Sequence, residues 1–322
     1  MLENEWHAEK VDRHLIAARV FPFGVSFLDD ALVGILPNDL IVIGARTGRG
    51  KTEFATTVAF NGASKGKRVL FFALEADKWE VQRRMKYRAI SRLYEQNYKG
   101  GFSKLDWPRY SEWLVQGFTT EWDALEKEAE RQLKVDAADL EIVYTGERYT
   151  VEQFIEQFES LSQDKDLIII DHLHYFDFGG REFEELPKAI HAIRDKALFA
   201  SKPVILIAHL RKGDRNGTDG LPTLDDFHGH SDIVKVATNV LIMSPAPDDQ
   251  AGNLGIFPTY FHIAKSRRAS ENLPWVGVMS FDRGSNTYAQ QYLVAKSKGK
   301  EQPELARADQ IPKWFKRARR TY

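Results

Sequence analysis

The stretch GARTGRGKTE, residues 44–53, interrupts an apolar part of the chain with three glycines, two arginines and a lysine. It follows the apolar run LIVIG (40–44) and precedes TEFATTVAFNGAS (52–64), whose composition is typical of a helix. Residues 45–52 match the phosphate-loop pattern, except that Ala45 stands where glycine is usual. A strand, a glycine-rich turn and a helix in this order predict a site where backbone N–H groups and a helix N-terminus face phosphates.

The residue types of this loop suit ATP and Mg²⁺. Gly48 and Gly50 allow the backbone to curl around the β-phosphate, and Lys51 is expected to contact the β- and γ-phosphates. The hydroxyl of Thr52 is expected to ligate Mg²⁺. The alternative is a glycine-rich turn that binds nothing. The residues predicted to bind the nucleotide are Ala45, Arg46, Thr47, Gly48, Arg49, Gly50, Lys51 and Thr52.

Short apolar runs alternate with segments of helical spacing along most of the chain. This alternation predicts an α/β fold with a mostly parallel central sheet and helices on both faces. The runs lie at 40–44, 69–74, 140–144, 167–171, 204–209 and 240–243. Three later runs joined by short polar loops predict antiparallel hairpins at the edge of the sheet. They lie at 260–266, 275–281 and 287–294.

Two acidic residues stand at the ends of predicted strands. Asp171 ends the most apolar run, and a carboxylate there is a candidate ligand of Mg²⁺, the alternative being an aspartate of a strand-terminal turn. Glu75 follows the run 69–74, which we place next to the phosphate-loop strand. It is a candidate to polarise the attacking water, the alternative being a surface glutamate.

Both ends of the chain are predicted to lie outside the core domain, residues 21–295. Residues 1–20 place apolar residues from Trp6 to Ile16 at helical intervals, which predicts a linker helix that packs on its own domain or on a neighbouring subunit. Residues 296–322 are charged and interrupted by proline, which predicts a basic tail that is either solvated or bound to a polyanion.

Composition limits the remaining possibilities. With 322 residues and 43% hydrophobic content, the chain can bury a core of ordinary size. A formal charge of −1 provides no overall field for a polyanion, so such a ligand needs a local basic patch. The absence of cysteine excludes disulfides and thiolate metal sites. Charges throughout the first residues and no long uncharged run predict a soluble, cytoplasmic protein without a membrane partner.

The ordered motifs GARTGRGKT, FFALEA, LIIIDHLHYF, ILIAHLRK and FHIAKSRRAS resemble the RecA-type motor domain of the replicative DnaB helicase family and of its phage and mitochondrial relatives. The resemblance spans about residues 21–294. It implies a RecA-like ATPase fold for the core domain, and an ATP-driven helicase or translocase on single-stranded DNA. It also implies a homo-oligomer, with a hexameric ring expected.

The resemblance assigns roles to four further residues. Glu75 is implied to activate water and His209 to sense the γ-phosphate, where bacterial members have glutamine; the alternative for His209 is a core histidine. Lys265 and Arg267 are implied to reach the nucleotide of a neighbouring subunit. Alternation along a strand puts these two on one face and Arg268, a competitor for the role, on the other. The alternative for the pair is a basic guard of the sheet edge.

DNA contacts are implied for the loop that follows residue 210. Arg211, Lys212 and Arg215 are the candidate phosphate contacts, although a plain surface loop is an equal alternative. The family carries a collar or primase domain ahead of the motor, whereas about 20 residues precede the core here. A loader or primase partner is therefore expected. The rival function is a RecA-like assembly protein, such as a recombinase, clock-type or loader ATPase, that uses ATP to set its oligomeric state.

Overall fold

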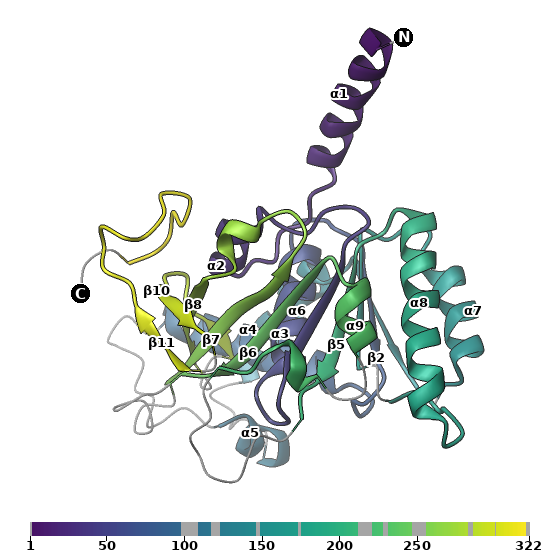
Figure 1. Cartoon of the computed structure of the whole chain (residues 1–322). Coiled ribbons are helices and arrows are strands. Elements are labelled where there is room, and N and C mark those ends of the chain that lie inside the picture. The colour runs from purple at the N-terminus through teal and green to yellow at the C-terminus, as the bar shows by residue number, and fades with distance from the viewer. Residues whose placement is uncertain are drawn as a thin grey trace.

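One mixed β-sheet runs through the protein, and the computed structural model shows helices on both of its faces (Figure 1). The structure describes residues 2–97, 109–116, 123–145, 149–172, 175–211, 221–227, 231–246, 256–282, 286–299 and 301–319. The parallel strands are β1 (Leu40–Ala45), β2 (Val69–Ala73), β3 (Leu140–Tyr144), β4 (Leu167–Asp171), β5 (Val204–His209) and β6 (Asn239–Pro245). The antiparallel strands are β7 (Ile256–Ser266), β8 (Trp275–Asp282), β9 (Thr287–Tyr288), β10 (Leu293–Lys298) and β11 (Glu301–Leu305).

The strand order is β11-β10-β8-β7-β6-β1-β5-β4-β2-β3, and β9 pairs with β8. Each predicted apolar run forms a strand, and the predicted fold class is confirmed. The run 287–294 is divided between β9 and the start of β10. β1 lies near the middle of the sheet with all of its residues buried, which explains its continuous apolar sequence.

Helices cover the two faces of the sheet separately. Ile41 and Ile43 of β1 face a core that includes α2 (Ser26–Leu32) and α3 (Lys51–Ala63). The alternate residues, Leu40 and Val42, face a second core with α7 (Val151–Leu161), α8 (Glu182–Ala200) and α9 (Ser231–Val236). Side chains of a strand alternate between its faces, so β1 contributes to both cores.

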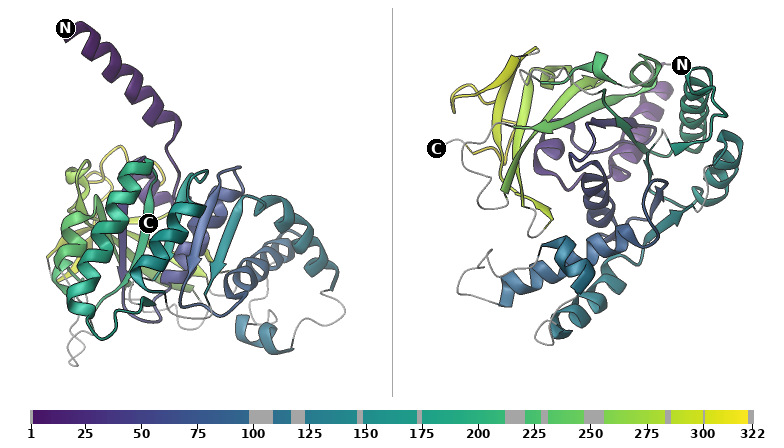
Figure 2. Two further views of the ribbon diagram at one scale, coloured as in Figure 1. Left: turned by 90° about the vertical axis from the view of Figure 1, so that its right-hand side faces the viewer. Right: turned by 90° about the horizontal axis from the view of Figure 1, so that it is seen from below.

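A helical lobe lies beside the sheet (Figure 2). It consists of α4 (Glu80–Asn97), α5 (Tyr110–Gln116) and α6 (Asp123–Asp136). A small core of its own holds it together, in which Tyr87 lies 5.7 Å from Trp113 between ring centroids. Residues 98–108 and 117–122, between these helices, lie outside the described residues.

The first helix, α1 (Leu2–Ala18), extends away from the body of the protein (Figure 1). Its large apolar residues Trp6 and Leu15 are 66% and 58% exposed. At the base of the helix, Nη2 of Arg19 donates a hydrogen bond to the carbonyl oxygen of Ser201. In the part of the chain that the structure describes, no helix is long and apolar enough to cross a membrane.

The predicted separate tail from residue 296 is wrong for the described residues up to 319. β10 continues to Lys298 and pairs with β11, so the sheet extends into this segment. Phe315 is fully buried in the main core, where its ring stacks on Phe27 of α2 with 5.5 Å between centroids. Burial of the Phe315 ring holds this segment against the core, whereas the charged residues beside it remain largely exposed.

The substitution Phe315→Ala should lower the free energy of unfolding by about 3 kcal/mol, because it removes a fully buried ring and leaves a cavity. The measurement is urea denaturation. The matched control is Phe199→Ala on α8, where the side chain is 93% exposed and a change within about 0.5 kcal/mol is expected. Equal effects of the two substitutions would show that the terminal segment is not part of the core.

Candidate active site

The phosphate loop joins the carboxyl end of β1 to the first residue of α3, as predicted. Gly48 and Gly50 have φ values of 72° and 80°, a region that glycine adopts without strain. A Cβ added to Gly48 would meet no atom within 4 Å, so the backbone angle and not lack of space requires glycine there. Gly50 is the N-cap of α3, and the positive end of that helix therefore faces the loop.

Lys51 lies under this loop with only 7% of its surface exposed. Its Nζ donates to the carbonyl oxygens of Ala45 and Arg46, both at 3.2 Å, and lies 3.3 Å from Nδ1 of His209. Burial lowers the pKa of the amine, and the charges of Asp171 and Glu75 oppose that shift. The loop thus holds a desolvated cation at the point where phosphates are expected.

Asp171 ends β4 and is 4% exposed. Burial raises the pKa of its carboxyl to about 6, a hydrogen bond with the Thr52 side chain lowers it, and the charge of Glu75 raises it further. Within the described residues, Oδ1 of Asp171 is buried without a hydrogen-bond partner. A hydroxyl and an unsatisfied carboxylate oxygen are the hard ligands that Mg²⁺ prefers, so Thr52 and Asp171 fit this ion.

Glu75 follows β2, but its strand is not next to the phosphate-loop strand. β5 and β4 lie between β1 and β2, so this predicted neighbourhood is wrong. An apolar run shows that a strand is buried and leaves its neighbours undetermined. Glu75 nevertheless reaches the site, because its Oε2 lies 2.9 Å from Nε2 of His172, and its side chain is 57% exposed.

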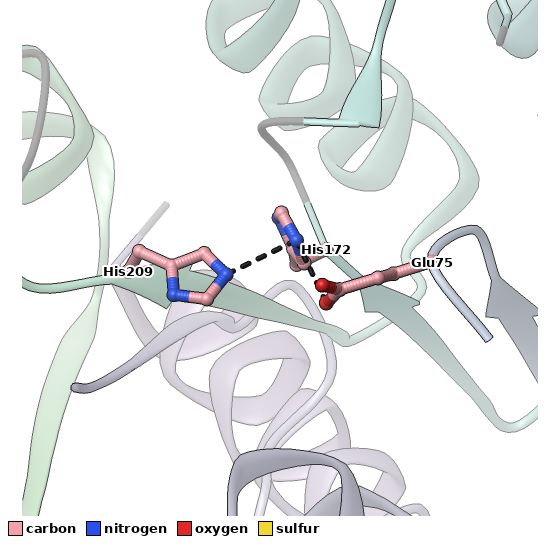
Figure 3. A group of neighbouring side chains, drawn as sticks. All are labelled: Glu75, His172 and His209. Carbon is pink, nitrogen blue, oxygen red and sulfur yellow. Dashed lines mark hydrogen bonds and ion pairs between the residues drawn. The ribbon is translucent and has the colours of Figure 1, made fainter. Parts of the chain in front are cut away.

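A pair of histidines links Glu75 to the phosphate loop (Figure 3). His209, the last residue of β5, has its Nε2 3.1 Å from Nε2 of His172, and the two rings meet edge to face. Contacts therefore run from Glu75 through His172 and His209 to Lys51. Sequence reasoning missed His172, although its place directly after Asp171 at a strand end was a usable signal.

A second missed feature is a buried ion-pair cluster on α3. Glu53, the residue after Thr52, is 4% exposed and lies 2.7 Å from Nη1 of Arg84 and 2.9 Å from Nη2 of Arg88. Both arginines belong to α4, the helix that follows Glu75. The cluster therefore fixes the first turn of α3 to the helix after the candidate water-activating residue. Two arginines four residues apart on one helix face were the signal in the sequence.

A small pocket that is open to solvent lies beside the phosphate loop. Two predicted loop residues, Arg46 and Arg49, form one side of it. The other lining residues are Leu221, Pro222, Met243, Ser244, Pro245, Tyr260 and Gln302. The pocket therefore combines two guanidinium groups with both polar and apolar surface.

Lys265 and Arg267 lie at the opposite edge of the sheet. β7 is antiparallel, and its last residue, Ser266, pairs with Asn239 at the start of β6. Nζ of Lys265 donates to the carbonyl oxygens of Val234 and Lys235, and Nη2 of Arg267 lies 3.5 Å from the latter oxygen. The structure therefore does not bring this pair to the phosphate loop of its own chain.

Arg268 has a different role within the chain. It forms an ion pair with Asp39, whose side chain is fully buried just before β1. The other carboxylate oxygen of Asp39 accepts a hydrogen bond from the backbone N–H of Leu36 at 2.8 Å. A buried carboxylate needs such a partner, so Arg268 is engaged in stabilising its own chain.

Arg211 is the one described member of the predicted DNA-contacting set. It follows β5 by two residues, is exposed, and its backbone N–H donates to the carbonyl oxygen of Asp226 at 2.7 Å. Lys212 and Arg215 lie outside the described residues.

The sequence matches the family described as DnaB-like helicase C terminal domain over residues 21–272. The chain belongs to this family. Similar curated proteins include the replicative DNA helicase DnaB of Nostoc sp., 28% identical over 220 residues, which cover 66% of this chain and 23% of that protein. The replicative DNA helicase DnaC of Bacillus subtilis is 26% identical over 230 residues, covering 69% and 46%. The chain therefore spans less than half the length of these relatives.

Solved structures agree on the fold. A solved structure described as an ATPase domain has a TM-score of 0.65 at 16% identity, covering 90% of this chain and 98% of that one. A DnaB-like replicative helicase, described with its interactions with primase, has a TM-score of 0.62 at 18% identity, covering 84% and 61%. The predicted family and RecA-like fold are confirmed, and nucleotide use is a property that the helicase relatives imply.

The substitution Asp171→Asn should stabilise the nucleotide-free protein at pH 7 by up to about 3 kcal/mol, since a shift from 3.8 to about 6 disfavours the charged carboxylate in the fold. Because the fold raises the pKa of Asp171, the free-energy cost of its negative charge is absent below pH 4. This cost grows as the pH rises towards 6 and is fully present at pH 7. The measurement is urea denaturation of parent and variant at pH 4 and pH 7. The control is Asp164→Asn, at an exposed position, which should not stabilise the protein. If the stability difference between Asp171→Asn and the parent were the same at pH 4 and pH 7, the cost of burying the carboxylate would be contradicted.

Proposed function

We propose that the chain is an ATP-hydrolysing, oligomeric DNA helicase or single-stranded DNA translocase of the DnaB type, with active sites shared between subunits. The observation that carries this proposal is the division of the site between the two edges of one sheet. The phosphate loop, Asp171 and Glu75 gather at the carboxyl edge, and the Lys265 and Arg267 pair lies at the other. Family membership supplies the link to helicases.

The phosphate loop would bind the triphosphate of ATP. Backbone N–H groups between Gly48 and Lys51 and the N-terminus of α3 would surround the β-phosphate. Lys51 would shift from the carbonyl oxygens of the loop to the β- and γ-phosphates. Thr52 and Asp171 would hold Mg²⁺, which neutralises charge on the phosphates when bound.

Glu75 is the residue best placed to orient and deprotonate the attacking water. Its carboxylate is largely exposed on the same edge as Asp171, because β2 and β4 are neighbouring parallel strands. His209 contacts Lys51 directly, so a change in the position of Lys51 on the γ-phosphate would be felt by His209. These contacts support a sensor role for His209 and a base role for Glu75.

A neighbouring subunit would complete the site. Lys265 and Arg267 cannot serve the loop of their own chain, since the length of the sheet separates them from it. Arg268 is engaged with Asp39, which leaves Arg267 as the better placed guanidinium. A planar guanidinium stabilises charge spread over γ-phosphate oxygens. A closed ring, with six subunits as in our prediction, would place every pair against the next nucleotide.

Single-stranded DNA is the proposed polymer substrate. Arg211 stands after β5 at the edge that carries His209, and with Lys212 and Arg215 it would contact phosphates. A ring multiplies such contacts, which offsets the near-neutral charge of the chain. A loader or primase is the proposed protein partner. The rival reading as an assembly protein has support only from fold, through a KaiC-like protein of Pyrococcus horikoshii with a TM-score of 0.52 at 16% identity.

ATP hydrolysis should increase in the presence of single-stranded DNA, and two substitutions should abolish it in different ways. Lys51→Ala removes the phosphate cation, so both binding and hydrolysis of ATP should be lost. Glu75→Gln removes the base, so ATP should bind while the hydrolysis rate falls at least about 100-fold. The measurements are phosphate release and binding of a fluorescent ATP analogue. If Glu75→Gln hydrolysed ATP at the parental rate, Glu75 would not be the base. If single-stranded DNA did not change the hydrolysis rate of the parent, the assembly-protein function would be favoured.

Arg267 should act on a neighbouring subunit. Arg267→Lys should lower kcat by about 1,000-fold, because lysine lacks the planar fork, whereas the adjacent control Arg268→Lys keeps a cation beside Asp39 and should retain most activity. Mixing Arg267→Lys with Lys51→Ala subunits should restore activity, since each keeps the part that the other lacks. A monomer that hydrolyses ATP at the full rate, or mixtures that stay inactive, would contradict a shared site.

A further inference from the structure

Three metal-binding side chains converge at the carboxyl edge of the sheet (Figure 3). Glu75, His172 and His209 follow or end β2, β4 and β5, which are consecutive strands in the sheet. The parallel order of these strands brings their carboxyl ends together. One ligand atom from each residue lies within 4.8 Å of the other two.

The hydrogen positions of this cluster depend on the tautomers of its two histidines. Nζ of Lys51 is a donor, so a neutral His209 that accepts from it at Nδ1 carries its hydrogen on Nε2. That hydrogen points to Nε2 of His172, which must then present its lone pair. The same nitrogen lies 2.9 Å from a carboxylate oxygen of Glu75, which also presents lone pairs. In this tautomer, two acceptors face each other at hydrogen-bond distance, and a cation between them would be favourable.

We propose that Glu75, His172 and His209 form a binding site for a transition-metal dication of the Zn²⁺ class. The ligand atoms are Oε2 of Glu75 and Nε2 of both histidines. Tetrahedral coordination with bonds of about 2.0–2.1 Å places neighbouring ligand atoms about 3.3 Å apart. Two of the three separations, 2.9 Å and 3.1 Å, are close to this value, and the ligand atoms of Glu75 and His209 lie within 4.8 Å of each other, so small side-chain movements admit the ion.

The types of ligand atom distinguish this site from the proposed magnesium site beside it. Two imidazole nitrogens and one carboxylate oxygen suit Zn²⁺, Co²⁺, Ni²⁺ or Cu²⁺, whereas Mg²⁺ prefers the oxygens of Thr52 and Asp171. Binding requires His209 to carry its hydrogen on Nδ1, so the contact with Nζ of Lys51 is lost. Lys51 keeps two carbonyl acceptors in the loop, which limits that cost. Three protein ligands leave a fourth position for water.

An occupied site would switch off hydrolysis, and this consequence rests on the proposed function. A carboxylate that ligates a dication has its lone pairs directed to the metal and is a poor base for water. His209 would at the same time lose its contact with Lys51. The metal would therefore hold two of the residues proposed to act on the γ-phosphate.

The direct test titrates the nucleotide-free 322-residue chain with Co²⁺ and records the visible absorption of tetrahedral Co²⁺, with Zn²⁺ as competitor. One ion per subunit is expected. His172→Ala and Glu75→Gln should bind at least about 100-fold more weakly, because loss of a mere supporting residue already costs about 10- to 100-fold. His191→Ala, an exposed histidine of α8, is the matched control with parental binding. Glu75 is largely exposed, so Glu75→Gln tests the site even if His172→Ala unfolds.

Parental affinity in Glu75→Gln or in a folded His172→Ala would overturn the site, as would the absence of a tetrahedral spectrum. The inhibitory role is tested separately by adding Zn²⁺ to protein that hydrolyses Mg²⁺–ATP. Hydrolysis should fall at least tenfold with Zn²⁺ occupancy and return when a chelator selective for Zn²⁺ over Mg²⁺ is added. Full hydrolysis with Zn²⁺ bound would overturn the inhibition, and a protein without any hydrolysis would reject the proposed function while the Co²⁺ result still decides the site.

Discussion

The parallel pairing of β1 with β5 and β6 is the constraint on which the rest of the site depends. β1 is buried on both faces, so its position is set by apolar packing above and below as well as by hydrogen bonds on each side. In this register Ala45 lies opposite His209, which brings Lys51 to the imidazole. The position of the phosphate loop is therefore set by a strand that is fully buried and paired on both sides.

The same geometry separates the two groups of charged residues that the function requires. A six-residue strand such as β1 is about 20 Å long, which is further than an arginine side chain reaches. The phosphate loop lies at one end of that length and Arg267 at the other. In the function that we propose, a single chain would hold two separate parts of the site, and association of chains would join them.

The carboxyl edge of the sheet, where we propose that the nucleotide binds, also contains two groups whose charged forms are disfavoured by burial. Burial lowers the pKa of Lys51 and raises that of Asp171, so both charged forms are less stable there than in water. A triphosphate and its metal ion would provide the opposite charges that these groups lack. Burial of these two groups destabilises the free protein, and a ligand of opposite charge would remove part of that cost on binding.

The sequence alone determined the strands, the phosphate loop and the strand-end residues Asp171 and Glu75. Each of these features depends on a few residues that are adjacent in the sequence. They are the burial of a strand, the need for positive φ at Gly48 and the position of a carboxylate after an apolar run. The linker helix could be recognised for the same reason, from spacing within a single segment.

Only the tertiary structure decided which of these segments meet. The order of β2 and β1 was predicted wrongly, because a pattern of burial does not specify the neighbouring strand. His172 gains its contacts from Glu75 and His209, which lie on the strands flanking β4 and far away in the sequence. Phe315 belongs to the core because Phe27, near the other end of the chain, supplies the surface on which it stacks. Each of these outcomes depends on contacts between distant segments, and such contacts form only when the chain packs as a whole.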